Sequence, residues 1–146
     1  MVRLTSDEKK YIAFIVIFAT ILLVTSYHSL FLLAPPFAVS TYLLTFDHGG
    51  RFSTYSSISA SYLFVILTTE AIHVLLGTGT LQMLLNVVLV SLFITFLPYR
   101  HPPALALTIF SYITHSTFDF TLSSITVLLI LLASRYILGH IRSYPR

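Results

Sequence analysis

The chain has 146 residues, of which 56% are hydrophobic and only 9% are charged. Soluble domains carry about 25% charged residues, so this composition argues against a water-soluble globule and more firmly against a disordered chain. The absence of cysteine excludes disulfides, thiolate zinc sites and iron–sulfur clusters. Eight Lys and Arg residues give a net charge of +3 without forming a basic surface for nucleic acid. The composition therefore predicts a small integral membrane protein with a single domain over residues 1–146.

The N-terminal third predicts a long helix followed by a short one. Residues 11–33 are apolar and free of charge, and about 20 such residues cross the hydrocarbon as a helix. Thr5 and Glu8, just before this run, have the spacing of a capping box. Residues 35–46 open with a Pro-Pro pair, which the first turn of a helix tolerates. At about 1.5 Å per residue this piece is too short to cross, so it predicts a half-helix or re-entrant helix.

The middle of the chain predicts two further spans separated by a tight turn. The second span covers residues 57–76 and is closed by Gly77, within the segment Gly-Thr-Gly-Thr. The third covers residues 81–97 and is ended by Pro98, because proline cannot continue the hydrogen-bonding of a helix.

The last third repeats the pattern of a short helix followed by a long one. Residues 102–118 open with a second Pro-Pro pair, and their length leaves open whether they cross. The fourth span covers residues 120–138, with Gly139 as its expected C-cap. The expected fold class is therefore an all-α membrane protein with four long transmembrane helices and two short helices initiated by Pro-Pro.

The two Pro-Pro segments have the pattern of an internal repeat. A shift of 67 residues places Pro35-Pro36 on Pro102-Pro103, Thr41 on Thr108 and His48 on His115. Repeats of this kind underlie many transporters, whose binding sites lie at broken helices. Independent recurrence of short motifs in membrane helices explains the same identities equally well, so both interpretations stay open.

Basic residues near the span ends predict the orientation. They flank both ends of the chain, which places the N-terminal segment 1–10 and the tail 139–146 in the cytoplasm of a protein in the cell membrane. With four crossings Arg51 and Arg100 fall outside, whereas six crossings, counting the short helices, place all eight basic residues inside. The charge rule favours six crossings and helix length favours four; the expectation adopted is four.

The segment Arg100-His101-Pro102-Pro103-Ala104 resembles the HPP family of small integral membrane proteins, named for its His-Pro-Pro tripeptide after an apolar span. The segment 36–40, Pro-Phe-Ala-Val-Ser, resembles the family's proline–phenylalanine–small–small–serine segment, and Arg51 stands where the family often has an arginine. These features keep their order over nearly the whole chain. Leu105 and Leu107, and the serine-rich stretch 56–61 in place of glycines, depart from the family. The resemblance implies a four-helix membrane domain with a transport role, nitrite transport being attributed to plastid members.

The starts of the two Pro-Pro helices are the candidate anion sites. A helix N-terminus presents unpaired N–H groups and partial positive charge, which attract anions. Adjacent basic residues strengthen this attraction, although arginines at span ends also simply reach lipid headgroups, and a Pro-Pro pair also simply starts a helix. The candidate substrate-binding residues are Arg100, His101, Pro102, Pro103, Ala104, Pro35, Pro36, Ser40 and Arg51.

Glu70 is the carboxylate deepest inside an apolar run, and His73 follows on the same helical face. An ionisable residue within a span is a functional hypothesis by default, so both are candidates for proton coupling, with structural pairing as the alternative. The Glu-x-x-His spacing also serves di-iron bundles, but a second such motif is lacking in the sequence. Gln82 and Asn86, four residues apart, are expected to hydrogen-bond across helices or to line a pore.

The sequence thus predicts a multi-pass transporter of a small inorganic anion, with nitrite as the leading candidate. Motifs of nucleophilic enzymes, metalloproteases and phosphate loops are lacking in the sequence, so neither an enzyme nor a bound cofactor or metal is expected. A homo-oligomer is expected in the lipid bilayer, because four helices are few for a pathway within one chain. The alternative is a structural or assembly subunit of a membrane complex, without transport activity.

Overall fold

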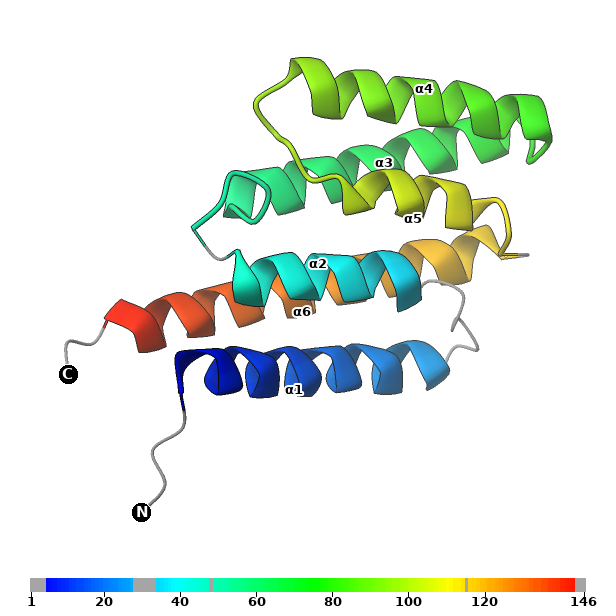
Figure 1. Cartoon of the computed structure of the whole chain (residues 1–146). Helices are drawn as coiled ribbons and strands as arrows, with labels where there is room; N and C mark the ends of the chain where they lie inside the picture. The colour runs from blue at the N-terminus through cyan, green and yellow to red at the C-terminus, as the bar shows by residue number, and fades with distance from the viewer. Residues whose placement is uncertain (1–4, 28–33, 48, 115, 144–146) are drawn as a thin grey trace.

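The computed structural model describes residues 5–27, 34–47, 49–114 and 116–143. In this described part the chain folds into six α-helices packed side by side (Figure 1). His48 and His115, and with them one of the repeat identities, lie outside it. The helices are α1 (Ser6–Tyr27), α2 (Ala34–Phe46), α3 (Tyr55–Leu76), α4 (Thr80–Phe96), α5 (Pro103–Ser111) and α6 (Thr117–Ser143).

The helices agree in number and order with the predicted elements, but not all in length. Three of them, α1, α3 and α6, are long and apolar enough to cross a membrane. The expected fourth long span is not confirmed, because α4 has only 17 residues and is a shorter apolar helix. Both helices that begin at Pro-Pro pairs are short, with 13 residues in α2 and 9 in α5.

The predicted helix boundaries at the start of α1 and the end of α3 are confirmed. The Thr5 N–H donates to Glu8 Oε2 at 2.7 Å, and the Glu8 N–H donates to Thr5 Oγ1 at 3.3 Å, which is the reciprocal capping box. After α3, Gly77 has φ 90°, a conformation that residues with a Cβ rarely adopt. Its N–H donates to the Ile72 carbonyl at 3.1 Å and closes the helix.

Two boundaries were predicted wrongly. Gly139 does not cap the last helix, because α6 continues to Ser143, and the rings of Tyr136 and His140 stack one turn apart across this position. The short helix predicted over 102–118 ends at Ser111 instead. A new helix follows, because Ser116 accepts a hydrogen bond from the Asp119 N–H at 3.2 Å and so caps the start of α6.

The short helices α2 and α5 each carry the chain back along the bundle. The start of α1, the loops before α3 and before α5, and the end of α6 therefore all lie at one end, while the turns after α3 and after α5 lie at the other (Figure 1). We call the first the basic end, because it carries the described Lys and Arg residues: Lys9, Lys10, Arg51, Arg100, Arg135 and Arg142. The expectation of Arg51 and Arg100 at the end opposite the termini is wrong for this fold, and a helix that re-enters and leaves at one end does not describe α2.

The two halves of the chain pack in equivalent ways. The packed pairs are α1 with α2, α4 with α5, α3 with α4, α1 with α6, α3 with α5, α2 with α6, α3 with α6 and α2 with α5. Exchanging the first three helices for the last three turns the set of pairs into itself, with α2–α5 and α3–α6 unchanged. Within the short helices, Thr41 donates to the Phe37 carbonyl at 2.8 Å and Thr108 donates to the Ala104 carbonyl at 3.0 Å, at positions related by the predicted shift.

The exterior of the bundle is apolar and its interior contains many polar side chains. Leu23 is 73% exposed and Leu75 is 78% exposed, and large apolar residues are exposed along the long helices. In water such contiguous apolar area is unfavourable by roughly 25 cal/mol per Å². This surface, with the three apolar helices, is that of an integral membrane protein. Hydroxyl groups are buried instead, on Ser40, Thr41, Ser57, Ser61, Thr69, Thr108 and Ser111 among others.

Candidate functional site

The two Pro-Pro motifs meet in the interior of the bundle. Ser40, one turn into α2, lies with its Oγ 2.9 Å from Nε2 of His101, the residue before Pro102 at the start of α5. Tyr62 of α3 places its hydroxyl 2.7 Å from the same Ser40 Oγ. Nδ1 of His101 lies 2.7 Å from the Phe52 carbonyl oxygen, in the loop before α3. We call Ser40, Tyr62, His101 and the Phe52 carbonyl the motif junction.

The hydrogen bonds of the motif junction form one directed chain. A carbonyl only accepts, so Nδ1 of His101 carries the hydrogen that it donates to Phe52. In the neutral ring Nε2 then accepts from the Ser40 hydroxyl, whose oxygen accepts in turn from the Tyr62 hydroxyl. Burial lowers the pKa of the His101 imidazole, which lies outside the three long helices, from its ordinary 6.5 to about 4. The ring is therefore neutral at pH 7, and every polar atom of its side chain is bonded.

Acidification is expected to destabilise the protein through His101. Between pH 6.5 and about 4 the unfolded chain binds a proton at this residue and the folded chain does not, so stability falls as the pH is lowered through this window. Unfolding midpoints of the purified protein in detergent, measured from pH 7.5 to 4.5, test this. The His101→Gln variant is expected to show a shallower decline, and an equal decline in both proteins contradicts the assignment.

A serine hydroxyl bonded to an imidazole is also the arrangement of a nucleophile and its base. Ser40 and His101 are both 0% exposed, however. The Ser40 hydroxyl also lies 3.0 Å from the Pro36 carbonyl, so its surroundings are filled by the protein's own groups. In this conformation the pair ties α2 to the start of α5 rather than presenting a hydroxyl to a substrate.

Arg51 and Arg100 flank the motif junction. Arg51 precedes Phe52 and Arg100 precedes His101, and these two residues share a hydrogen bond. The Arg51 guanidinium lies 4.7 Å from the centre of the Phe52 ring. Arg51 is exposed and Arg100 is half-buried. Asp47, also exposed, is the acidic residue of the same loop. The structure thus brings Ser40 and His101 together and places Arg51 and Arg100, which we call the rim arginines, next in sequence to residues of the motif junction.

The helix starts themselves differ from the expected anion sites. The N–H of Ala104 donates to the His101 carbonyl at 3.1 Å, and the N–H of Leu105 donates to the Pro102 carbonyl at 3.0 Å. The unpaired N–H groups expected after the Pro-Pro pair are therefore occupied within the turn. Of the prolines, Pro36 and Pro103 are buried, as is Ala104, whereas Pro35 and Pro102 are exposed.

A second polar cluster lies at the other end of α3. The Glu70 carboxylate accepts a hydrogen bond from the Thr121 hydroxyl of α6. Nδ1 of His73 lies 3.4 Å from the Thr117 hydroxyl, also on α6. The Glu70 and His73 side chains, predicted as proton-coupling candidates, are thus both held against the first turns of α6.

This second cluster continues onto α4 and the residue after α5. Nδ2 of Asn86 donates to the Thr69 hydroxyl at 3.0 Å, which is the hydrogen bond across helices expected of Asn86. The Tyr112 ring packs edge-on against His73 with their centres 4.5 Å apart, and its hydroxyl donates to the Gln82 carbonyl at 3.1 Å. We call Thr69, Glu70, His73, Asn86, Tyr112, Thr117 and Thr121 the acidic-end cluster, because Glu70 and Asp119 are the described carboxylates at this end.

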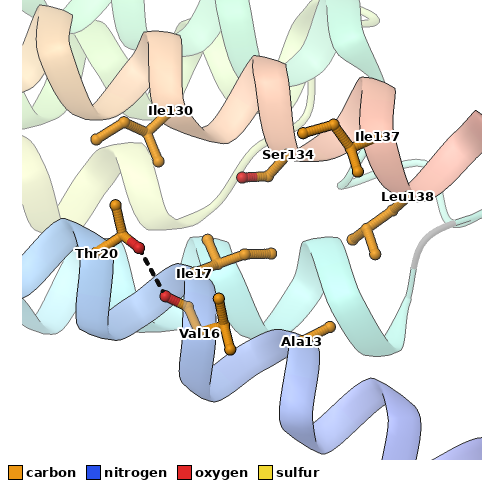
Figure 2. Close-up of a pocket in the computed structure, with 8 residues that line it drawn as sticks. All are labelled: Ala13, Val16, Ile17, Thr20, Ile130, Ser134, Ile137 and Leu138. Carbon is orange, nitrogen blue, oxygen red and sulfur yellow. Dashed lines mark hydrogen bonds between the residues drawn. The ribbon is translucent and has the colours of Figure 1, made fainter.

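An apolar groove of about 280 Å³ lies between α1 and α6 (Figure 2). Its two hydroxyl-bearing residues are Thr20, which donates to the Val16 carbonyl at 2.9 Å, and Ser134. None of the predicted substrate-binding residues lines it, so this groove is separate from the motif junction. The lining residues are Ala13, Val16, Ile17, Thr20, Ile130, Ser134, Ile137 and Leu138.

Sequence reasoning missed Tyr62 and the Phe52 carbonyl. Tyr62 is fully buried in the middle of α3, whereas interfacial tyrosines lie at span ends. A phenol in the middle of an apolar span needs a hydrogen-bond partner, and this was the available signal. The Phe52 carbonyl is a backbone group and left no trace in the sequence.

Comparisons with known proteins identified no relative: no family model, no curated protein and no solved structure matches this chain.

Proposed function

We propose that this protein transports a small inorganic anion across the membrane, with nitrite as the leading candidate, as its resemblance to the HPP family implies. The observation that carries the proposal is the motif junction. The residue pattern that gives the resemblance includes Ser40 and His101, and these two side chains form a hydrogen bond although 61 residues separate them. Anions bind where donors and positive charge converge, and hydroxyl donors with flanking arginines converge here.

The proposed architecture is an inverted repeat of two halves, each with an apolar helix, a short Pro-Pro helix and a second, long apolar helix. In transporters such halves place the site at their interface near broken helices. The exchange symmetry of the packed helix pairs supports this relation. We propose that α2 and α5 carry the chain back along the bundle without spanning the hydrocarbon alone, because 13 and 9 residues are too short for that, and that the basic end faces the cytoplasm.

The proposed mechanism uses bonds between the two halves as a gate. The His101–Ser40 and His101–Phe52 hydrogen bonds join the halves, as does the bond from the Ser61 hydroxyl to the Tyr99 carbonyl at 2.9 Å. When the halves part, the hydroxyl donors of the junction become available, and an anion drawn in by the arginines replaces the lost partners. Glu70 and His73 are the proposed proton-coupling groups, and a homo-oligomer is the proposed assembly.

Anion flux into liposomes containing the purified protein tests the proposal. Uptake of nitrite, nitrate and chloride is measured at several pH values against protein-free liposomes. We expect nitrite uptake that Ser40→Ala reduces several-fold and that Ser59→Ala, a change of a more exposed serine on α3, leaves unchanged. Absence of flux for all three anions contradicts transport and favours the alternative, a structural or assembly subunit.

Single-cysteine labelling tests the proposed crossings, and the chain has no native cysteine to remove. Gly49 and Thr78 are exposed positions in turns at opposite ends of the bundle. In inside-out vesicles a membrane-impermeant maleimide is expected to label Gly49→Cys together with a cysteine placed next to Lys9, and not Thr78→Cys. Labelling of Gly49→Cys from the side opposite to the cysteine next to Lys9 contradicts the return of the chain to the basic end through α2.

A further inference from the structure

The acidic-end cluster contains buried polar atoms without a partner. Asn86 is 0% exposed, and its Oδ1 atom has no hydrogen-bond partner among the described residues. The same holds for Nε2 of His73, on the neighbouring helix. Buried polar atoms are nearly always hydrogen-bonded, and an unpaired one indicates an ordered water or ion. The two atoms thus point to a small polar guest.

Tyr112 connects the residues that carry these two atoms. Its ring packs against the His73 imidazole at 4.5 Å between centres, and its phenol interacts with the Asn86 side chain. Asn86 and His73 therefore lie against the same tyrosine, and Glu70 stands one helical turn before His73 on α3. An acceptor oxygen, an imidazole nitrogen and a carboxylate thus belong to one cluster of packed residues on α3 and α4, against α6.

We propose that this cluster is a proton-binding site in which a water molecule held by Asn86 and His73 delivers protons to Glu70. The proton comes from the aqueous phase at the acidic end, and the Glu70 carboxylate takes it up as a neutral carboxyl group beside Thr121. The site is expected to bind a proton rather than an anion, because the formal charge within the cluster is the negative charge of the Glu70 carboxylate. The role of this site in coupling rests on the proposed function, whereas proton binding itself is measured without transport.

The groups in contact with Glu70 and His73 come from neighbouring elements: Tyr112 from the end of α5, and Thr117 and Thr121 from α6. Asn86 reaches the cluster from α4, and Asp119 is the titratable residue of the first turn of α6. Asp119 therefore serves as the matched control for Glu70, because it is the other carboxylate at this end of the bundle.

Infrared difference spectra of the purified protein in lipid nanodiscs, recorded over a pH titration without any anion substrate, test the site. We expect a band of a protonated carboxyl group that is present in the wild type and in Asp119→Asn and is absent from Glu70→Gln. Asn86→Leu is expected to lower proton uptake by Glu70.

Each outcome decides the proposal. A titrating band that survives in Glu70→Gln, or proton uptake that Asn86→Leu leaves unchanged in a folded protein, overturns the site. The comparison of Glu70→Gln with Asp119→Asn decides the proposal if Asn86→Leu fails to fold. A titrating Glu70 in a protein that moves no anion retains the proton site and removes only the proposed function.

Discussion

Replacing His101 with Ala is expected to lower the free energy of unfolding by about 3–5 kcal/mol. The side chain is fully buried and bonded at both ring nitrogens. Its removal leaves a cavity and deprives Ser40 and the Phe52 carbonyl of a partner in the interior. Reversible unfolding in mixed micelles, followed by circular dichroism at constant detergent, measures the loss.

The matched control is His140→Ala, because His140 is exposed near the end of α6. It is expected to change stability by less than about 0.5 kcal/mol. A double-mutant cycle of His101→Ala with Ser40→Ala isolates the bond between the two motifs, and we expect a coupling energy of about 0.5–3 kcal/mol. Additive losses contradict the motif junction as a linked unit.

The parts of the fold that the sequence predicted correctly follow from local rules. Charge-free length placed the long helices, and the Pro-Pro pairs marked the starts of α2 and α5. Thr5 with Glu8, and Gly77, marked boundaries through hydrogen bonds and backbone freedom that depend on neighbouring residues alone. The wrong boundary at Gly139 has the same origin, because glycine permits a helix end without requiring one.

The candidate site was predicted only as separate pieces. Ser40 and His101 were both chosen, each for the helix start next to it, but their contact depends on how α2 and α5 pack. The same holds for Arg51 and Arg100, whose shared position follows from the return of the chain through two short helices (Figure 1). Spacing along the sequence carries no information about packing across 49 or 61 residues.

The fold also explains why histidine precedes a proline pair here. Pro102 holds φ at −54° just after His101, which restricts the backbone at the junction. The turn then closes through the Ala104 N–H and the His101 carbonyl. A restricted backbone lowers the entropy lost when the imidazole is fixed between Ser40 and Phe52. The prolines thus support the junction rather than an anion at the helix start.

Neutralising both rim arginines, by Arg51→Gln with Arg100→Gln, is expected to reduce nitrite uptake at low ionic strength about tenfold or more. Arg51 and Arg100 stand next in sequence to Phe52 and His101 of the motif junction, and their positive charges are expected to raise the local anion concentration there. Because exposed charges are screened over about 10 Å at 0.1 M salt, the difference from wild type is expected to shrink as salt increases. Initial uptake rates in liposomes, measured at two salt concentrations, give both values.

The matched control for the rim arginines is Lys9→Gln with Lys10→Gln, which removes the same charge at the same end of the bundle. These lysines lie at the start of α1, away from the loop that holds Arg51 and from Arg100. If the rim arginines act on the anion, their loss reduces uptake much more than loss of the lysines, and lysine at positions 51 and 100 restores most of it. If the arginine pair and the lysine pair reduce nitrite uptake equally, only the net charge of the basic end attracts the anion. That result contradicts the proposal that the anion enters at the motif junction.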